Sequence, residues 1–104
     1  MSCELCNLDT IVHLYDDSDP RFIIIDCMSC LVPMIVWRQS HTMSIPPRDW
    51  AEMEIALRTV ADKKFGKHNY YIDRQQRAVP DHLHWHARSA TLANGYTMPE
   101  YELN

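Results

Sequence analysis

The segment from residue 82 to residue 88 reads His-Leu-His-Trp-His-Ala-Arg, so that histidines and apolar residues alternate along it. Successive side chains of a β-strand point to opposite faces, and this alternation therefore predicts a strand with His82, His84 and His86 on one face. In a helix, with about 100° between successive residues, the same spacing would scatter both sets of side chains. We expect the apolar face to pack against a core and the histidine face to be the functional surface.

The short length and the scarcity of glycine limit the chain to one small domain. It has 104 residues, 46% of them hydrophobic, and two glycines, a composition typical of a packed globule. We expect a single domain over residues 1–104, with an N-terminal C-x-x-C segment at 1–10 and a C-terminal tail from about 89 to 104. Because glycine is so scarce, a glycine-rich phosphate-binding loop is excluded, and we expect no organic cofactor.

The remaining secondary structure follows from shorter patterns. Strand-like segments occupy residues 11–15, 21–26, 31–38 and 69–73. Pro46 and Pro47 fix φ at the start of a helix that ends at Gly66. The predicted inner stripe of this helix is Trp50, Met53, Leu57 and Val60. Because the connections between the first three strands are too short for parallel crossovers, we expect an α+β fold, a mainly antiparallel sheet of about five strands with one principal helix.

The charge pattern excludes one large class of partner. The chain carries a formal net charge of -4 at pH 7, and Lys63-Lys64 is its longest basic run, so we expect no binding to duplex nucleic acid. No apolar run has membrane-spanning length, and the opening Met-Ser-Cys-Glu-Leu-Cys lacks the basic and apolar regions of a signal peptide. We therefore expect a cytoplasmic protein that does not bind membranes.

A row of histidines suits reactions at phosphorus. Histidines on one face of a strand lie about 7 Å apart, so each can contact a different group of an extended ligand. Neutral imidazole is both a nucleophile and a general base, and its cation stabilises anionic phosphate oxygens. The pattern therefore favours phosphoryl transfer.

Residues 79–86, Val-Pro-Asp-His-Leu-His-Trp-His, resemble the signature of the histidine-triad (HIT) superfamily, His-x-His-x-His with apolar residues between. They are similar to the Val-Pro-His-Leu-His-Trp-His form of one bacterial branch, with Asp81 as an extra residue. Three further segments resemble the acidic turn, the second strand and the basic segment of that family: Tyr15-Asp-Asp17, Phe22-Ile-Ile-Ile-Asp26 and Arg38-Gln-Ser-His41. The resemblance covers most of the chain and implies a HIT-like fold.

The resemblance implies an enzyme, a nucleotide hydrolase or nucleotidyltransferase acting on a nucleotide or a nucleoside-phosphate conjugate. The middle histidine, His84, would attack the α-phosphorus and form a nucleotidyl-histidine, while His86 would bind phosphate oxygens or assist the leaving group. Asp26 would hydrogen-bond the ribose hydroxyls, and a homodimer is also implied. Arg88 and Arg38 are candidates for phosphate contacts that residues usual in the family would make and that are missing here, because guanidinium groups match phosphate geometry.

The four cysteines form two C-x-x-C pairs, which in a chain without a secretory signal are typical of metal ligands or reduced thiols. Their spacing alone predicts a four-cysteine zinc site: Cys3, Cys6, Cys27 and Cys30. Zinc-containing HIT relatives, including galactose-phosphate uridylyltransferases, imply a different set: Cys3, Cys6, His41 and His82. In this second set, which we favour, zinc would be structural, and His84 and His86 would carry the chemistry. A third interpretation has all four cysteines reduced and without metal.

Two other functions stay open. HIT proteins usually carry a polar residue shortly before the triad, where this chain has Ala78 and Val79. The chain is therefore alternatively a non-catalytic, zinc-stabilised module for nucleotide binding or dimerisation. The second alternative is a metalloenzyme in which the His-x-His pair binds a catalytic metal, as in unrelated β folds. If His82 is not a zinc ligand, it is the third member of the catalytic set.

Overall fold

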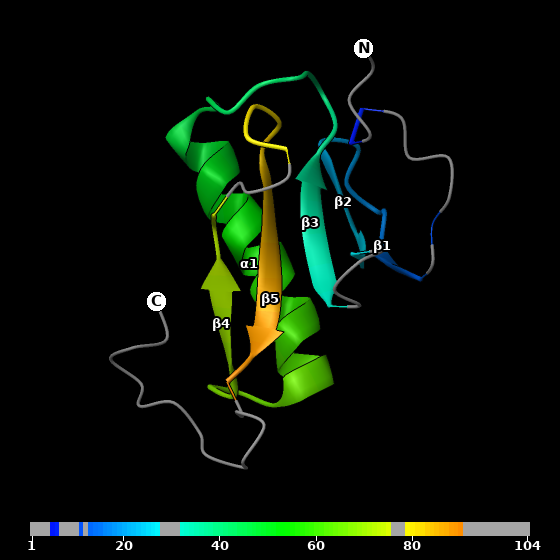
Figure 1. Ribbon diagram of the computed structural model, residues 1–104, viewed down its shortest axis with the longest axis vertical. Coiled ribbons are helices and arrows are strands. Elements are labelled where there is room, and N and C mark those ends of the chain that lie inside the picture. The colour runs from blue at the N-terminus through cyan, green and yellow to red at the C-terminus, as the bar shows by residue number, and fades with distance from the viewer. Residues whose placement is uncertain (1–4, 7–10, 12, 28–31, 76–78, 91–104) are drawn as a thin grey trace.

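The computed structural model describes residues 5–6, 11, 13–27, 32–75 and 79–90. In chain order their elements are β1 (Leu14–Asp16), β2 (Phe22–Asp26), β3 (Pro33–Trp37), α1 (Pro47–Phe65), β4 (Tyr70–Asp73) and β5 (His84–Ser89). The strands form one sheet in the order β1-β2-β3-β5-β4, and every neighbouring pair is antiparallel (Figure 1). The predicted α+β class is confirmed. In this part of the chain, no helix combines the length and the hydropathy that crossing a membrane requires.

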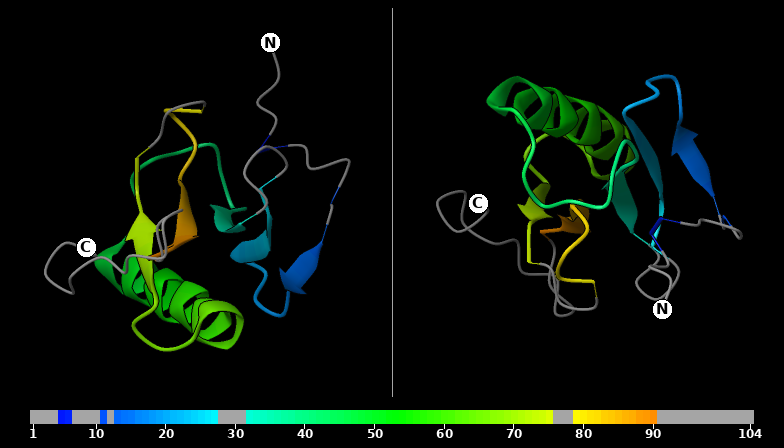
Figure 2. Two further views of the ribbon diagram at one scale, coloured as in Figure 1. Left: turned by 60° about the horizontal axis from the view of Figure 1, so that its bottom comes forward. Right: turned by 90° about the horizontal axis from the view of Figure 1, so that it is seen from above.

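Helix α1 lies against one face of the sheet, behind β3, β5 and β4 (Figures 1 and 2). It starts at Pro47, where no main-chain N–H is needed, and ends before Gly66, whose φ of 90° favours glycine. Its buried side chains are Met53, Leu57 and Ala61. Of the predicted stripe, Met53 and Leu57 are buried and Val60 is partly buried against the same core. Trp50 is 38% exposed, with its ring edge-on to that of Trp85 at 4.6 Å.

The sheet has apolar side chains on both faces, because β2 and β3 are continuous hydrophobic runs rather than alternating ones. Under α1 the buried core includes Phe22, Ile24, Ile35, Trp37 and Trp85. The opposite face carries a second buried cluster, which includes Leu5, Ile23, Ile25, Met34 and Val36. The N-terminal segment therefore contributes to the layer on the face away from the helix.

The register of β5 sets its histidines on the face opposite α1. Val36 of β3 pairs with His84, and Met34 pairs with His86; paired residues of antiparallel strands share a face. Because Val36 and Met34 belong to the cluster away from the helix, the two histidines lie on that same face. The intervening Trp85 packs under α1. The predicted alternation is confirmed for this part of the segment.

The prediction that His82 belongs to the strand is wrong, because β5 begins at His84. Just before the strand, the main-chain N–H of Leu83 donates to the carbonyl of Thr42, in the loop after β3, at 2.8 Å. The carbonyl of Leu83 still accepts the main-chain N–H of Trp37 in β3 at 3.1 Å, so only the N–H of Leu83 bonds outside the ladder. At its other end β5 extends to Ser89. The other strands overlap their predicted segments.

Candidate functional site

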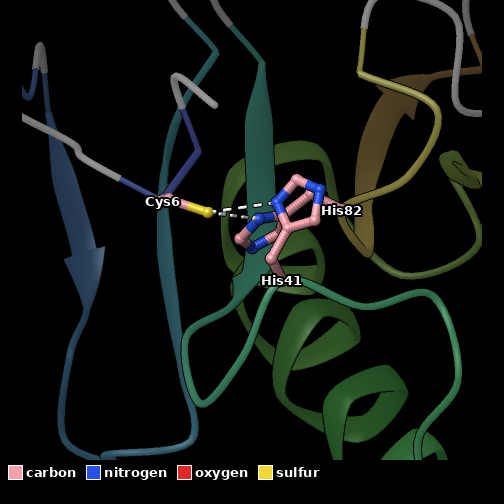
Figure 3. A group of neighbouring side chains, drawn as sticks. All are labelled: Cys6, His41 and His82. Carbon is pink, nitrogen blue, oxygen red and sulfur yellow. Dashed lines mark hydrogen bonds between the residues drawn. The ribbon is translucent and has the colours of Figure 1, made fainter. Parts of the chain in front are cut away.

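Three side chains from distant parts of the sequence meet at one end of the central strands β3 and β5 (Figure 3). Cys6 comes from the N-terminal segment, His41 from the loop after β3, and His82 from the turn before β5. The sulfur of Cys6 lies 3.1 Å from Nδ1 of His41 and 3.3 Å from Nδ1 of His82. All three potential ligand atoms lie within 4.8 Å of one another. The structure therefore assembles three of the four residues predicted as the mixed zinc site.

The outer nitrogen of each imidazole in this cluster faces an acceptor. Nε2 of His82 lies 2.6 Å from the main-chain oxygen of Trp37, and Nε2 of His41 lies 3.1 Å from a carboxylate oxygen of Asp81. A carbonyl or carboxylate oxygen only accepts, so both Nε2 atoms carry a proton, and in the neutral rings Nδ1 has a lone pair. The hydrogen bond from His41 lowers the pKa of the Asp81 carboxyl.

The convergence of lone pairs fits a metal ion. The thiol of Cys6 has one proton and can donate it to only one of the two Nδ1 atoms that face the sulfur. Zinc, with bonds of about 2.3 Å to sulfur and about 2.0 Å to nitrogen, places tetrahedral ligand atoms roughly 3.5 Å apart. The observed sulfur–nitrogen distances of 3.1 and 3.3 Å are close to that separation. This donor set can therefore hold a metal ion.

The other cysteines predicted as ligands do not decide the fourth position. Cys3 and Cys30 lie outside the described residues. Cys27 is buried at the end of β2, in the apolar cluster opposite the helix. Within the described part of the chain, Cys27 does not belong to the group formed by Cys6 and the two histidines. The geometry thus favours the mixed cysteine and histidine set over the four-cysteine set.

His84 is oriented by the main chain of the residue two positions before it. Its Nδ1 lies 2.8 Å from the carbonyl oxygen of His82, so Nδ1 carries the proton, and in the neutral ring Nε2 has a lone pair. The ring of His86 stands edge-on to it, with centroids 5.5 Å apart. Both residues are buried, with 4% and 8% of their surface exposed. His84 thus has the tautomer that a nucleophilic Nε2 requires.

Asp73 is a site residue that sequence reasoning missed. It pairs with His86 across β4 and β5, and its Oδ2 accepts a hydrogen bond from Nε of Arg88 at 2.7 Å. Arg88, predicted as a phosphate ligand, therefore lies on the histidine face beside a buried carboxylate. The only signal of Asp73 in the sequence is its place at the end of a predicted strand. That it lies beside His86 and Arg88 depends on the register between β4 and β5, which the sequence does not show.

One predicted nucleotide ligand, Asp26, is not brought to the histidine face. Asp26 follows Ile25 in β2 and so points to the face of the sheet that α1 covers. There its carboxylate accepts a hydrogen bond from the hydroxyl of Tyr15 at 2.7 Å. Burial, followed by the hydrogen bond and the charge of Asp26, raises the pKa of Tyr15 to about 12. Arg38 is exposed just after β3. Of the predicted nucleotide ligands, Arg88 therefore lies on the face of the histidines and Asp26 on the opposite face.

Searches against protein-family models, curated proteins and solved structures found no match to this chain. The functional hypothesis therefore depends on the residues of the site and their geometry.

Proposed function

We propose that this protein is a nucleotide hydrolase or nucleotidyltransferase of the HIT type, which acts at an α-phosphate through a nucleotidyl-His84 intermediate. The observation that supports it best is the 2.8 Å hydrogen bond between Nδ1 of His84 and the carbonyl of His82. A neutral imidazole held in this tautomer presents a basic, nucleophilic Nε2. The adjacent ring of His86 supplies a second titratable group for the same phosphate.

The reaction proceeds in two displacements. In the first, the Nε2 lone pair of His84 forms a bond to the α-phosphorus, and the bond to the leaving group breaks, with its electron pair remaining on the leaving group. His86, in its cationic form, donates a proton to that group. In the second, a water molecule or another acceptor attacks the phosphorus, its proton returns to His86, and the phosphorus–nitrogen bond breaks. Dividing the displacement in this way lets one group leave before the next enters.

We further propose that Cys6, His41 and His82 hold a structural zinc ion, with Cys3 as the fourth ligand expected from the sequence. A zinc ion with four protein ligands fixes the segments that supply them and has no open position for water. The side chain of His82 would then serve the metal while its carbonyl orients His84. His84 and His86 carry the chemistry in this arrangement.

The test is turnover of adenosine phosphoramidate and of diadenosine polyphosphates by the full chain. We expect the wild type to turn over both kinds of substrate. In His84→Ala the turnover rate should fall at least about 10³-fold, as for other nucleophile deletions. His13→Ala is the matched control, because His13 is exposed and lies beside β1. Intact-mass analysis should also detect a nucleotide adduct that His84→Ala lacks. No turnover of either substrate by the wild type would contradict the proposal.

One observation favours a second candidate, a non-catalytic module that binds nucleotide or dimerises. His84 and His86 are only 4% and 8% exposed, whereas a nucleophile must be reached by the phosphorus it attacks. This candidate predicts that nucleotides bind, as measured by calorimetry, but are not turned over. Among the described residues, the potential metal ligands do not include the His84 and His86 pair, so no observation favours the His-x-His metalloenzyme.

A further inference from the structure

Three cationic or titratable side chains follow one another on a single face of β5. His84, His86 and Arg88 occupy alternate positions of this strand, and same-face neighbours in a strand lie about 7 Å apart. His84 is the proposed nucleophile, so His86 and Arg88 lie progressively farther from the point of attack. In the other direction, the side chain of His82 turns to the Cys6 cluster. An anionic group extending from the α-phosphorus is therefore attracted toward Arg88.

The guanidinium of Arg88 is held in place by Asp73. Asp73 lies opposite His86, so the bond from Nε of Arg88 to Oδ2 of Asp73, 2.7 Å long, runs diagonally between the strands. The other carboxylate oxygen accepts the main-chain N–H of Gln75 at 3.0 Å. Held from two sides, the carboxylate fixes the direction of the guanidinium. A pre-organised guanidinium loses less entropy when it binds a phosphate oxygen.

The burial of this ion pair argues for a functional role. The side chain of Asp73 is 7% exposed and that of Arg88 is 25% exposed. Removing two charges from water costs about as much as their attraction returns, so a buried pair adds little net stability over apolar residues of the same volume. Asp73 and Arg88 also lie beside the proposed catalytic histidines rather than at a remote part of the sheet.

We propose that Arg88, positioned by Asp73, binds the phosphate of the leaving group and makes the site selective for substrates in which that group is itself a phosphate. This inference rests on the proposed function. Diadenosine tetraphosphate has such a leaving group, whereas the amine of adenosine phosphoramidate is small and carries no phosphate. Arg88 therefore contacts the first substrate in its reaction and not the second.

The experiment compares kcat and KM for these two substrates in the wild type, Arg88→Gln, Arg88→Lys and Asp73→Asn. We expect Arg88→Gln to lower kcat/KM for the tetraphosphate at least about 10-fold, the effect of losing one charged hydrogen bond, and the phosphoramidate value less than about 3-fold. Arg88→Lys keeps the charge without the guanidinium and should recover part of the loss. The ratio of the two substrates in one preparation does not depend on the fraction of folded protein.

Asp73→Asn separates positioning from charge. If Asp73 positions Arg88, the variant lowers kcat for the tetraphosphate while KM stays near its wild-type value, because the guanidinium keeps its charge but loses its direction. A lower KM with unchanged kcat would mean that Asp73 only screens Arg88, and would overturn its positioning role. Equal losses for both substrates in Arg88→Gln would overturn the selectivity. That result, with His84→Ala inactive, would leave the proposed function intact, whereas an inactive wild type would remove both.

Discussion

His82 connects the two parts of the site through different atoms of one residue. Its Nδ1 faces the sulfur of Cys6, its Nε2 donates to the carbonyl of Trp37, and its own carbonyl accepts a hydrogen bond from Nδ1 of His84. The proposed metal ligand and the acceptor that orients the proposed nucleophile thus belong to one residue. Substituting the side chain of His82 would disturb both functions, so partners of His41 are better suited to testing the metal site by itself.

Asp81 offers such a test. Its carboxylate accepts from Nε2 of His41 at 3.1 Å, and a carboxylate in this position makes the imidazole a better ligand. We expect Asp81→Asn to weaken zinc binding about 10-fold, the lower end for such partners, because Asp81 is 72% exposed. Competition with a chromogenic chelator measures the affinity. Asp17→Asn, an exposed carboxylate in the turn after β1, is the matched control and should bind zinc as the wild type does.

The raised pKa of Tyr15 leads us to expect that the folded protein loses stability at alkaline pH. Its pKa is raised from 10.0 to about 12 in the folded protein, so the folded state holds the hydroxyl proton more tightly than the unfolded chain does. This contribution is complete below pH 10 and is lost as the pH rises to about 12. In Tyr15→Phe, which has no ionisable hydroxyl, the free energy of unfolding should fall less steeply over this range. Urea titrations at a series of pH values measure the free energy of unfolding. If it falls equally steeply with pH in both proteins, the raised pKa is not that of Tyr15.

At the scale of elements, α1 positions the site by covering one face of the sheet, to which β5 contributes its apolar side chains. Leu83, Trp85 and Ala87 bury their side chains under the helix. This burial forces the alternate residues, His84 and His86, onto the opposite face. The helix itself is held by a narrow stripe, and its remaining positions face solvent or lie at the border. The orientation of the histidines therefore depends on the packing of α1.

Two substitutions in α1 test this dependence. Leu57 is fully buried, with 0% of its surface exposed, whereas Ile55, two residues earlier, is 66% exposed. We expect Leu57→Ala to lower the free energy of unfolding by about 2–5 kcal/mol, because it leaves a cavity under the helix. Ile55→Ala should change it by less than about 0.5 kcal/mol. Urea denaturation measures both values, and similar effects at the two positions would mean that the packing face of α1 is assigned wrongly.

At the scale of the whole molecule, the Cys6 cluster joins segments that are far apart in the chain. Cys6 is 35 positions from His41 and 76 positions from His82. A metal ion that binds all three stabilises only the folded state, because the unfolded chain does not hold these residues together. The loops between these residues are long, so the unfolded chain would lose much entropy by bringing them together around a metal ion.

Metal removal should therefore lower the stability of the whole domain. At a zinc concentration of about 100 times Kd, binding adds about 2.7 kcal/mol to the free energy of unfolding. We expect a chelator to lower the thermal midpoint of the wild type and added zinc to restore it. Cys6→Ser, which removes the sulfur ligand, should melt at the same temperature with and without chelator. If the wild type is equally insensitive to the chelator, the cluster does not hold a metal in solution.

Local rules allowed the sequence to determine much of this protein. The period of two in the histidine segment placed His84 and His86 on one face, since strand side chains alternate whatever lies next to them. The start of α1 at Pro47 and its end at Gly66 follow from backbone conformations that these two residues favour. The α+β class followed from the order and the short connections of such elements.

Only the tertiary structure decided which residues share the site. The side of the sheet to which Asp26 points depends on where the helix packs, and the proximity of Asp73 to His86 and Arg88 depends on the register between β4 and β5. Just after His82, the main-chain N–H of Leu83 bonds to the carbonyl of Thr42 in a distant loop. These are contacts between segments far apart in the chain. Their geometry is fixed by the packing of the whole sheet, which no local pattern of side chains encodes.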